Sequence, residues 1–296
     1  HLPGLGQTRR SLALERGERE EEKEEMKILF TVLFCLCVPL MAADKEKPLP
    51  EDFKSIKALA ENGDARAQLE AGNCLRWGYG GMEKDLKAAV AWYLKAAEQG
   101  HAEAQFKLGD VYQFGGAGVD RDLKEAFKWF RKAAEQGHAA AQNSIGSHFF
   151  SQGPDKNKEA TKWFRKAAEQ GHPGAQFNLG AAYMSASGVK GNQAEAIKWW
   201  RRAAEKSDAM SQAQLGKLFW KGGPVPEDKV RAFAWFSLAA RNGAMEGMFD
   251  VIEGDLPDKA QIDQAMTPEQ ITKAQALIKE MIKKNPKLIK LSPASL

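Results

Sequence analysis

One stretch of sequence decides the fold: AEAQFKLGDVYQFGGAGVDRDLKEAFKWFRKAAEQG, residues 102–137. Its first half places Ala104, Leu108 and Tyr112 four residues apart, which is the spacing of one stripe along an α helix. Glycines then break the pattern, and small and aromatic residues return at helical spacing over residues 123–136. The stretch therefore predicts two helices joined by a turn.

This unit recurs about five times, which makes repetition the dominant feature of the sequence. The string KAAEQG stands at residues 95–100, 132–137 and 166–171, with altered copies at 202–207 and 238–243. Each unit also carries a glutamine with a glycine four residues later; the glutamines are Gln68, Gln105, Gln142, Gln176 and Gln212. The steps between these glutamines are 37, 37, 34 and 36 residues. Because one such helix pair cannot bury its own apolar stripe, the copies must stack on one another.

The ends of the array follow the same scheme. Residues 52–62 resemble an isolated second helix, and residues 244–254 resemble a decayed first helix. Thr267 to Gln270 predicts a capping box that starts a helix over residues 268–284. We therefore predict an all-α fold, an α/α superhelical solenoid of about five two-helix repeats with capping helices. Its predicted parts are an N-terminal capping helix (44–63), five repeats (64–100, 101–137, 138–171, 172–207, 208–243) and a C-terminal half repeat with a capping helix and tail (244–296).

A secretory signal is predicted over residues 26–43. Lys27 precedes an eleven-residue apolar run, residues 28–38, which is shorter than the roughly 20 residues of a transmembrane helix. The small pair Ala42 and Ala43 follows, and we expect cleavage after one of them. The mature chain is therefore expected in the bacterial periplasm or outside the cell, without stable membrane insertion.

The residues before this signal are interpreted as an untranslated or disordered extension, residues 1–25. Residues 15–25 are almost entirely Glu, Arg, Lys and Gly, a composition that packs no core. Translation is expected to start at Met26.

Charge and cysteine content exclude several functional classes. The 296 residues include 43 Lys and Arg against 39 Asp and Glu, a net charge of +4 that is too small to predict a nucleic-acid partner. Three cysteines are too few for a disulfide scaffold or a multi-cysteine zinc site. Only Cys74 lies beyond the predicted signal, at a mostly apolar position of the repeat, so we expect it to be packed.

The search for catalytic chemistry gives no candidate. His101, His138 and His172 share one repeat position, directly after the glycine that ends a helix, and we interpret them as helix caps. Equivalent residues in stacked units are roughly 18–20 Å apart, too far for a shared metal ion. His148 stands alone at its position and is expected to be structural. The glycine-rich turns lack the phosphate-loop string, so we predict no catalytic, cofactor or metal site.

A binding surface is predicted from the positions that vary between repeats. Packing fixes the recurrent positions, so variable ones with i, i+4, i+7 spacing on each first helix are expected to share one stripe. The predicted partner-binding residues are Arg66, Glu70, Asn73, Glu103, Lys107, Asp110, Ser144, Ser147, Asn178, Gln214 and Lys217. The alternative is a plain solvated face with no partner.

The repeated unit closely resembles the Sel1-like repeat, a relative of the tetratricopeptide repeat with a turn of variable length. The resemblance rests on three successive motifs, A-x-A-Q-x-x-L-G-x-x-Y, then G-x-G-V, then A-x-x-W-F-x-K-A-A-E-Q-G. The resemblance covers roughly residues 64–243; a shortened turn at 153–157 and Leu75 in place of an aromatic residue are its departures. It implies that the first helices line the concave side of the solenoid. It also implies an adaptor role in signalling, envelope or host-contact processes.

We therefore predict an exported, non-enzymatic scaffold that binds a protein or peptide on its concave face. One alternative is a secreted hydrolase of β-lactamase type, because some cysteine-rich Sel1-like proteins are linked to that activity. The cysteine pairs of those repeats are missing here, and neither Ser55 nor Ser144 begins a Ser-x-x-Lys motif. Binding of a cell-wall glycan is a third possibility.

Overall fold

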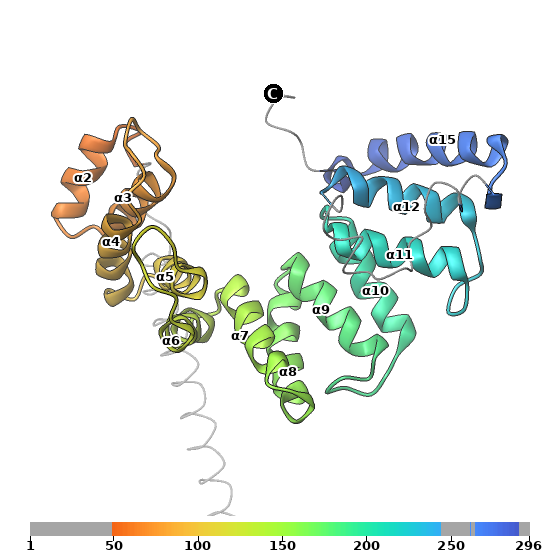
Figure 1. The fold of residues 1–296 in the computed structure, drawn as a ribbon, viewed down its shortest axis with the longest axis horizontal. Coiled ribbons are helices and arrows are strands. Elements are labelled where there is room, and N and C mark those ends of the chain that lie inside the picture. Colours follow the sequence, from red (N-terminus) through yellow and green to blue (C-terminus); the bar gives the residue numbers. More distant parts are fainter. Residues whose placement is uncertain (1–48, 244–260, 262–263, 290–296) are drawn as a thin grey trace, which may run out of the picture. The chain divides into compact units, whose positions relative to one another are not determined.

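The computed structural model describes residues 49–243, 261 and 264–289. The chain divides into two units, residues 1–50 and 51–296, and every described helix belongs to the second (Figure 1). The predicted signal (26–43) and decayed first helix (244–254) lie outside the described residues. Within the described part there are α helices and two short 3-10 helices but no strand: α2 (Phe53–Glu61), α3 (Ala65–Trp77), α4 (Leu86–Glu98), α5 (Ala102–Phe114), α6 (Leu123–Glu135), α7 (Ala139–Ser151), η1 (Pro154–Lys156), α8 (Asn157–Glu169), α9 (Pro173–Met184), α10 (Gln193–Ala204), α11 (Ala209–Lys221), α12 (Lys229–Arg241), α15 (Pro268–Lys284) and η2 (Pro286–Leu288).

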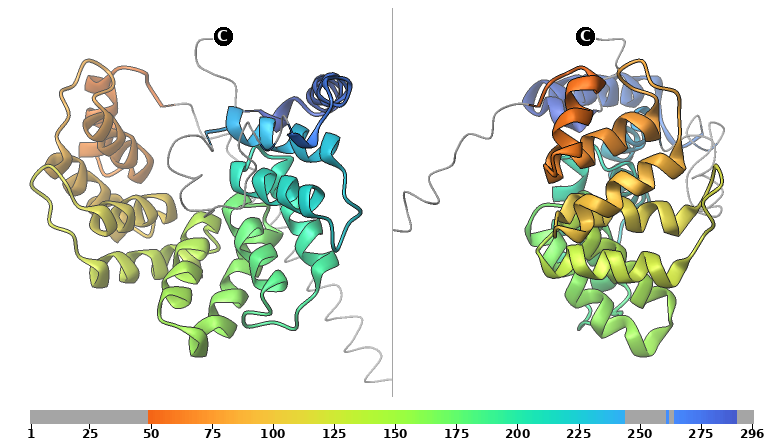
Figure 2. Two further views of the ribbon diagram at one scale, coloured as in Figure 1. Left: turned by 45° about the vertical axis from the view of Figure 1, so that its right-hand side comes forward. Right: turned by 90° about the vertical axis from the view of Figure 1, so that its left-hand side faces the viewer.

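The helices pack in the order of the chain. The most extensive contacts lie within five pairs, α3–α4, α5–α6, α7–α8, α9–α10 and α11–α12, and each pair also packs against the next (Figures 1 and 2). Helix α2 covers the first pair, and α15 packs against α12. This arrangement confirms the predicted all-α solenoid of two-helix repeats.

A glycine on each first helix lets the second helix of the pair approach closely. A Cβ atom at Gly109 would lie 2.6 Å from the ring of Phe130, closer than real Cβ contacts allow. The same contact recurs in every repeat, as Gly72–Tyr93, Gly109–Phe130, Gly146–Phe164, Gly180–Trp200 and Gly216–Phe236. The repeated glycine of the first helix and the aromatic residue of the second therefore form one packing contact in each repeat.

The boundary between repeats is a glycine followed by a helix cap. Gly137 has φ +92°, a left-handed conformation that favours glycine, and its N–H donates to the carbonyl of Ala134. His138 Nδ1 then accepts from the N–H of Ala141 at 3.2 Å. Equivalent histidines cap α5 and α9, which confirms the predicted role of His101, His138 and His172.

The repeated glutamines form a series of buried amide contacts that joins neighbouring repeats. Gln105 is 4% exposed; its Nε2 donates to the carbonyl of Ala97 at 3.0 Å, and its Oε1 accepts from Gln136 Nε2 at 2.7 Å. These two bonds satisfy both ends of a buried amide. In four repeats, a side-chain amide at the end of the second helix donates to the glutamine of the first helix. The donor–acceptor pairs are Gln99–Gln68, Gln136–Gln105, Gln170–Gln142 and Asn242–Gln212.

Repeat four breaks this series. Lys206 occupies the position of the second-helix glutamine, and its Nζ donates instead to the carbonyl of Gly171 at 2.6 Å. The Oε1 atom of Gln176, which is 4% exposed, is left without a hydrogen-bond partner among the described residues. A buried acceptor without a donor lowers the stability of the folded state.

The C-terminal segment closes the last repeat. The predicted capping box is present at Thr267 and Gln270, where α15 begins. Ile278 of α15 and Leu288 of η2 join Leu238 in one apolar cluster. The carbonyl of Leu288 also accepts from Gln212 Nε2 at 2.9 Å and Asn242 Nδ2 at 2.7 Å. The segment therefore covers the amide pair of the last repeat.

We expect Gly109→Ala to lower the free energy of unfolding by about 1–3 kcal/mol, because the added methyl group overpacks the contact with Phe130. Urea unfolding followed by circular dichroism at 222 nm measures the change. The control is the same substitution made in a Phe130→Leu variant. Leucine has no ring to meet the added methyl group, so Gly109→Ala should lower the free energy of unfolding much less there. Equal costs in both backgrounds would contradict the proposed steric cause.

We expect Lys206→Gln to raise the free energy of unfolding by about 1 kcal/mol, because the new amide can donate to Gln176 Oε1. Lys206→Met is the matched control, since it removes the contact with Gly171 without adding an amide. Both variants are measured by urea unfolding. A glutamine variant no more stable than the methionine variant would show that Gln176 gains nothing from the substitution.

Candidate protein-interaction face

The predicted binding residues all lie on one set of helices. We call the partly exposed side chains of α3, α5, α7, α9 and α11 the first-helix face. Of the predicted residues, Ser147 is exposed and the others are half-buried: Arg66, Glu70, Asn73, Glu103, Lys107, Asp110, Ser144, Asn178, Gln214 and Lys217. By contrast, Lys128, Lys162 and Lys198 on second helices expose 53–62% of their side chains.

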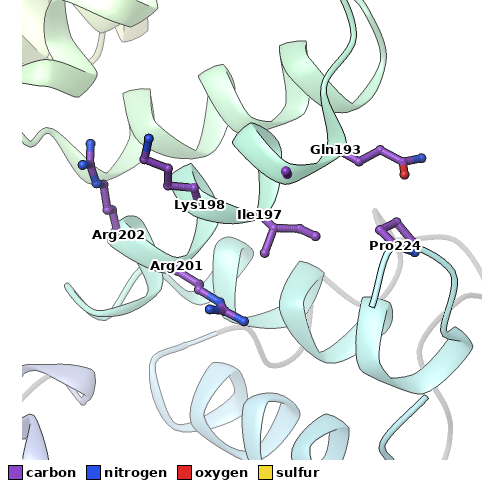
Figure 3. A pocket seen from close by; sticks show the side chains of 7 residues that line it. Gln193, Ile197, Lys198, Arg201, Arg202 and Pro224 are labelled. Atoms are coloured by element: carbon purple, nitrogen blue, oxygen red, sulfur yellow. The ribbon is translucent and has the colours of Figure 1, made fainter. Parts of the chain in front are cut away.

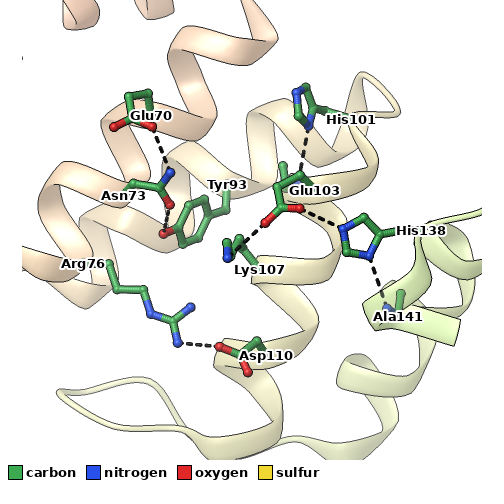
Figure 4. Close-up of polar contacts among 11 residues, drawn as sticks. Glu70, Asn73, Arg76, Tyr93, His101, Glu103, Lys107, Asp110, His138 and Ala141 are labelled. Atoms are coloured by element: carbon green, nitrogen blue, oxygen red, sulfur yellow. Dashed lines mark hydrogen bonds and ion pairs between the residues drawn. The ribbon is translucent and has the colours of Figure 1, made fainter. Parts of the chain in front are cut away.

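Glu103 is the centre of a charged cluster on this face (Figure 4). Its Oε1 accepts from Lys107 Nζ at 3.0 Å, and its Oε2 accepts from His138 Nε2 at 2.7 Å. Because His138 Nδ1 is the acceptor of the helix cap, the ring proton is assigned to Nε2, which donates to Glu103. The hydrogen bond from His138, with Lys107 beside it, lowers the pKa of Glu103 to about 2. The carboxylate is therefore anionic and held between two repeats.

Three further hydrogen bonds continue this cluster to α3. Arg76 Nη2 donates to Asp110 at 2.5 Å, linking repeats one and two (Figure 4). Within repeat one, the hydroxyl of Tyr93 donates to Asn73 Oδ1 at 2.9 Å, and Asn73 Nδ2 donates to Glu70 at 3.0 Å. Burial raises the pKa of Tyr93 to about 12, so the hydroxyl stays protonated and keeps donating.

Several predicted binding residues therefore also hold the repeats together. Asp110 and Glu103 bond to side chains of neighbouring repeats, and Asn178 Nδ2 donates to Asn143 Oδ1 at 3.0 Å in the same way. Sequence reasoning missed the partners Arg76, His138 and Asn143. They lie 34 or 35 residues from their contacts, about one repeat, so complementary pairs at that separation are the signal that could have found them.

A pocket of about 480 Å³ lies between α5, α6 and α7. Three predicted residues line it, Asp110, Ser144 and Ser147, together with aromatic residues that were not predicted. Phe114 stands at its rim with 70% of its surface exposed. The other predicted residues, including Gln214 and Lys217 on α11, lie outside this pocket.

His148 also lines the pocket. Its ring centroid lies 4.3 Å from that of Phe127, and burial lowers its pKa below the ordinary value of 6.5. The ring is therefore neutral near pH 7, and its Nε2 is 2.8 Å from Gln152 Nε2. The pocket thus combines an aromatic wall with hydroxyl groups and one carboxylate.

Cys74 is a buried free thiol, 4% exposed, and burial raises its pKa. It is packed, as predicted. Over the described residues, no three His, Cys, Asp or Glu side chains are grouped closely enough to hold a metal ion. In the same part of the chain, no helix combines the length and apolarity needed to cross a membrane.

Five consecutive segments of the sequence match the Sel1 repeat family, residues 65–101, 102–138, 139–172, 173–208 and 209–243. The chain belongs to the Sel1 repeat family. This assignment agrees with the resemblance inferred from the repeated motifs, and with the paired helices of the structure.

Solved structures of bacterial Sel1 repeat proteins are similar to this chain. The crystal structure of c5321, a protective antigen of uropathogenic Escherichia coli with an SLR fold, is 35% identical, covers 80% of this chain and has a TM-score of 0.71. The match covers 49% of that protein, so this chain spans about half of its length. A Sel1 repeat protein from Oxalobacter formigenes is 32% identical, with 75% of this chain and 90% of that chain covered and a TM-score of 0.60. The comparison with curated proteins gave no match.

We expect Glu103→Gln to lower stability most above pH 4.5. The folded pKa of Glu103 is about 2 and its ordinary value is 4.5, so its stabilising contribution is complete above pH 4.5 and is lost as the pH falls towards 2. The difference in unfolding free energy between wild type and Glu103→Gln should therefore shrink over this interval, as measured by urea unfolding. Glu125→Gln, which alters an exposed pair with Lys128, should change stability by less than about 1 kcal/mol. A Glu103→Gln effect that is independent of pH would contradict the link to His138.

Proposed function

We propose that this chain is an exported, non-enzymatic scaffold that binds a protein or peptide along its first-helix face. Sel1 repeat proteins are generally protein-interaction scaffolds. A row of similar helices presents many side chains on one extended surface, and such a surface suits recognition of another polypeptide better than turnover of a small substrate.

The pocket between α5 and α7 is the observation that carries this proposal. Phe114 is 70% exposed at its rim, while Ser144, Ser147 and Asp110 offer polar groups beside it. An aromatic anchor surrounded by hydrogen-bonding side chains is typical of the centre of a protein interface. The charged cluster around Glu103 adjoins the pocket through α5 and supplies fixed charges of both signs.

Export is supported by the sequence of residues 26–43, with its short apolar run and small residues at the expected cleavage site. The proposed partner is accordingly a protein of the bacterial envelope or beyond it.

A photo-crosslinking residue at position 147 tests the proposed face. Replacing Ser147 with p-benzoylphenylalanine places the reactive group at an exposed position of the pocket, and the same replacement of Lys158, exposed on α8 of the same repeat, is the control. After irradiation in living bacteria, mass spectrometry should identify a defined protein crosslinked from position 147 and not from position 158. The same products from both positions would contradict the proposal.

We further expect Ser144→Arg, which fills the pocket with a large charged side chain, to reduce crosslinking from position 147 at least roughly tenfold, since interface centres carry most of the binding energy. The helical circular dichroism should stay unchanged, because Ser144 is only half-buried. Lys158→Arg is the control. Undiminished crosslinking in a folded Ser144→Arg variant would remove the pocket from the interface.

A further inference from the structure

Arg201 differs from its equivalents in the other repeats. In repeat two, Arg131 Nε donates to Glu135 Oε1 at 2.9 Å, and in repeat three, Arg165 Nη2 donates to the hydroxyl of Tyr183 at 2.9 Å. Beside Arg201, in repeat four, the residue equivalent to Tyr183 is Phe219 of repeat five, which has no hydroxyl. Within the part of the chain that the structure describes, the guanidinium of Arg201 makes no hydrogen bond or ion pair.

Two adjoining hollows share this arginine. One, of about 580 Å³, lies between α10 and the loop after α11. Figure 3 shows Lys198, Arg201 and Arg202 leaving α10, with Ile197 beside them on the side that faces Pro224. The other, of about 350 Å³, is lined by Arg201, Phe219, Arg231, Trp235, Leu277 and Met281. Its walls come from α10, α11, α12 and α15.

The charged side chains that line these hollows are all positive. None of the described residues that line them is acidic, whereas Lys198, Arg201, Arg202 and Arg231 are basic. Two nearby carboxylates neutralise part of this charge, since Glu195 pairs with Lys198 at 3.1 Å and Asp228 pairs with Arg231 at 3.3 Å. Arg201 keeps its full hydrogen-bonding capacity beside an apolar surface.

We propose that the hollows around Arg201 form a second docking site, for an acidic peptide segment of a partner protein. A carboxylate of the segment accepts two hydrogen bonds from the Arg201 guanidinium, the geometry that this group matches best. Apolar side chains of the segment pack against Trp235, Leu277 and Met281. This site is formed by the second helices α10 and α12, by α15 and by the buried Phe219 of α11. It uses none of the partly exposed side chains of the first-helix face, so it is distinct from that face and does not depend on it.

Fluorescence anisotropy with the full chain tests the site. The probe is a fluorescein-labelled eight-residue peptide that alternates Leu or Phe with Asp or Glu, measured in roughly 0.15 M salt. We expect saturable binding, a loss of affinity of roughly tenfold in Arg201→Gln, and no change in Arg131→Gln, the equivalent arginine that is already paired. A peptide with Asn and Gln in place of its acids should bind no better to wild type than to Arg201→Gln.

A second variant keeps every charge. Phe219→Tyr offers Arg201 the hydroxyl that Tyr183 offers Arg165, so it should weaken probe binding without removing the arginine. Ser144→Arg should leave probe binding unchanged, which separates this site from the proposed first-helix interface. Equal binding to Arg201→Gln and Arg131→Gln, or loss of binding in Ser144→Arg, would overturn the proposal. Binding that appears only after the acids of residues 244–260 are neutralised would also overturn it, because the occupant would then be this chain's own segment.

Discussion

The close approach of two helices at a glycine is the contact on which the rest of the structure depends. At Gly109 and its equivalents, the ring of the second helix lies where a Cβ would be, and only glycine leaves that space. The contact lets a pair of short helices bury aromatic side chains that neither could bury alone. It recurs in each repeat, so it fixes the orientation of every pair. The positions that the contact does not use are left to vary, and they make up the first-helix face.

The buried glutamines are the polar counterpart of this packing. An amide that is removed from water needs partners for both its oxygen and its nitrogen, and each repeat supplies one of them to the next. The first repeat therefore needs a substitute for a preceding repeat, and the carbonyl of Ala60 in α2 provides it by accepting from Gln68 Nε2. The carbonyl of Leu288 is a further acceptor for the amides of Gln212 and Asn242 at the C-terminal end. Repeat four interrupts the series at Gln176, one repeat before that end. Arg201, unlike Arg131 and Arg165, also makes no hydrogen bond or ion pair within the described part of the chain, so both departures from the pattern fall within repeat four.

Stability and recognition share residues on the first-helix face. Glu103 and Asp110 bond across repeat boundaries, so a partner that binds them meets side chains already held in place. Such ordering lowers the entropy lost on binding. The second helices are different, because their basic side chains are largely exposed and pair along their own helix, as Lys198 does with Glu195. The two proposed sites therefore use preorganised polar groups in one case and an unpaired guanidinium in the other.

The repeated motifs alone determined the helical pairs, their order, the histidine caps and the glycine–aromatic packing, because each of these depends on residues close in the chain or at one fixed period. The sequence also placed eleven candidate residues on the first helices. Only the tertiary structure decided which side chains they touch, since Arg76 meets Asp110 and His138 meets Glu103 across the boundaries between neighbouring repeats. The same holds for the vacant acceptor at Gln176 and for the hollows around Arg201. Both depend on how far a side chain of one repeat reaches into the next, and that distance is set by packing rather than by spacing along the chain.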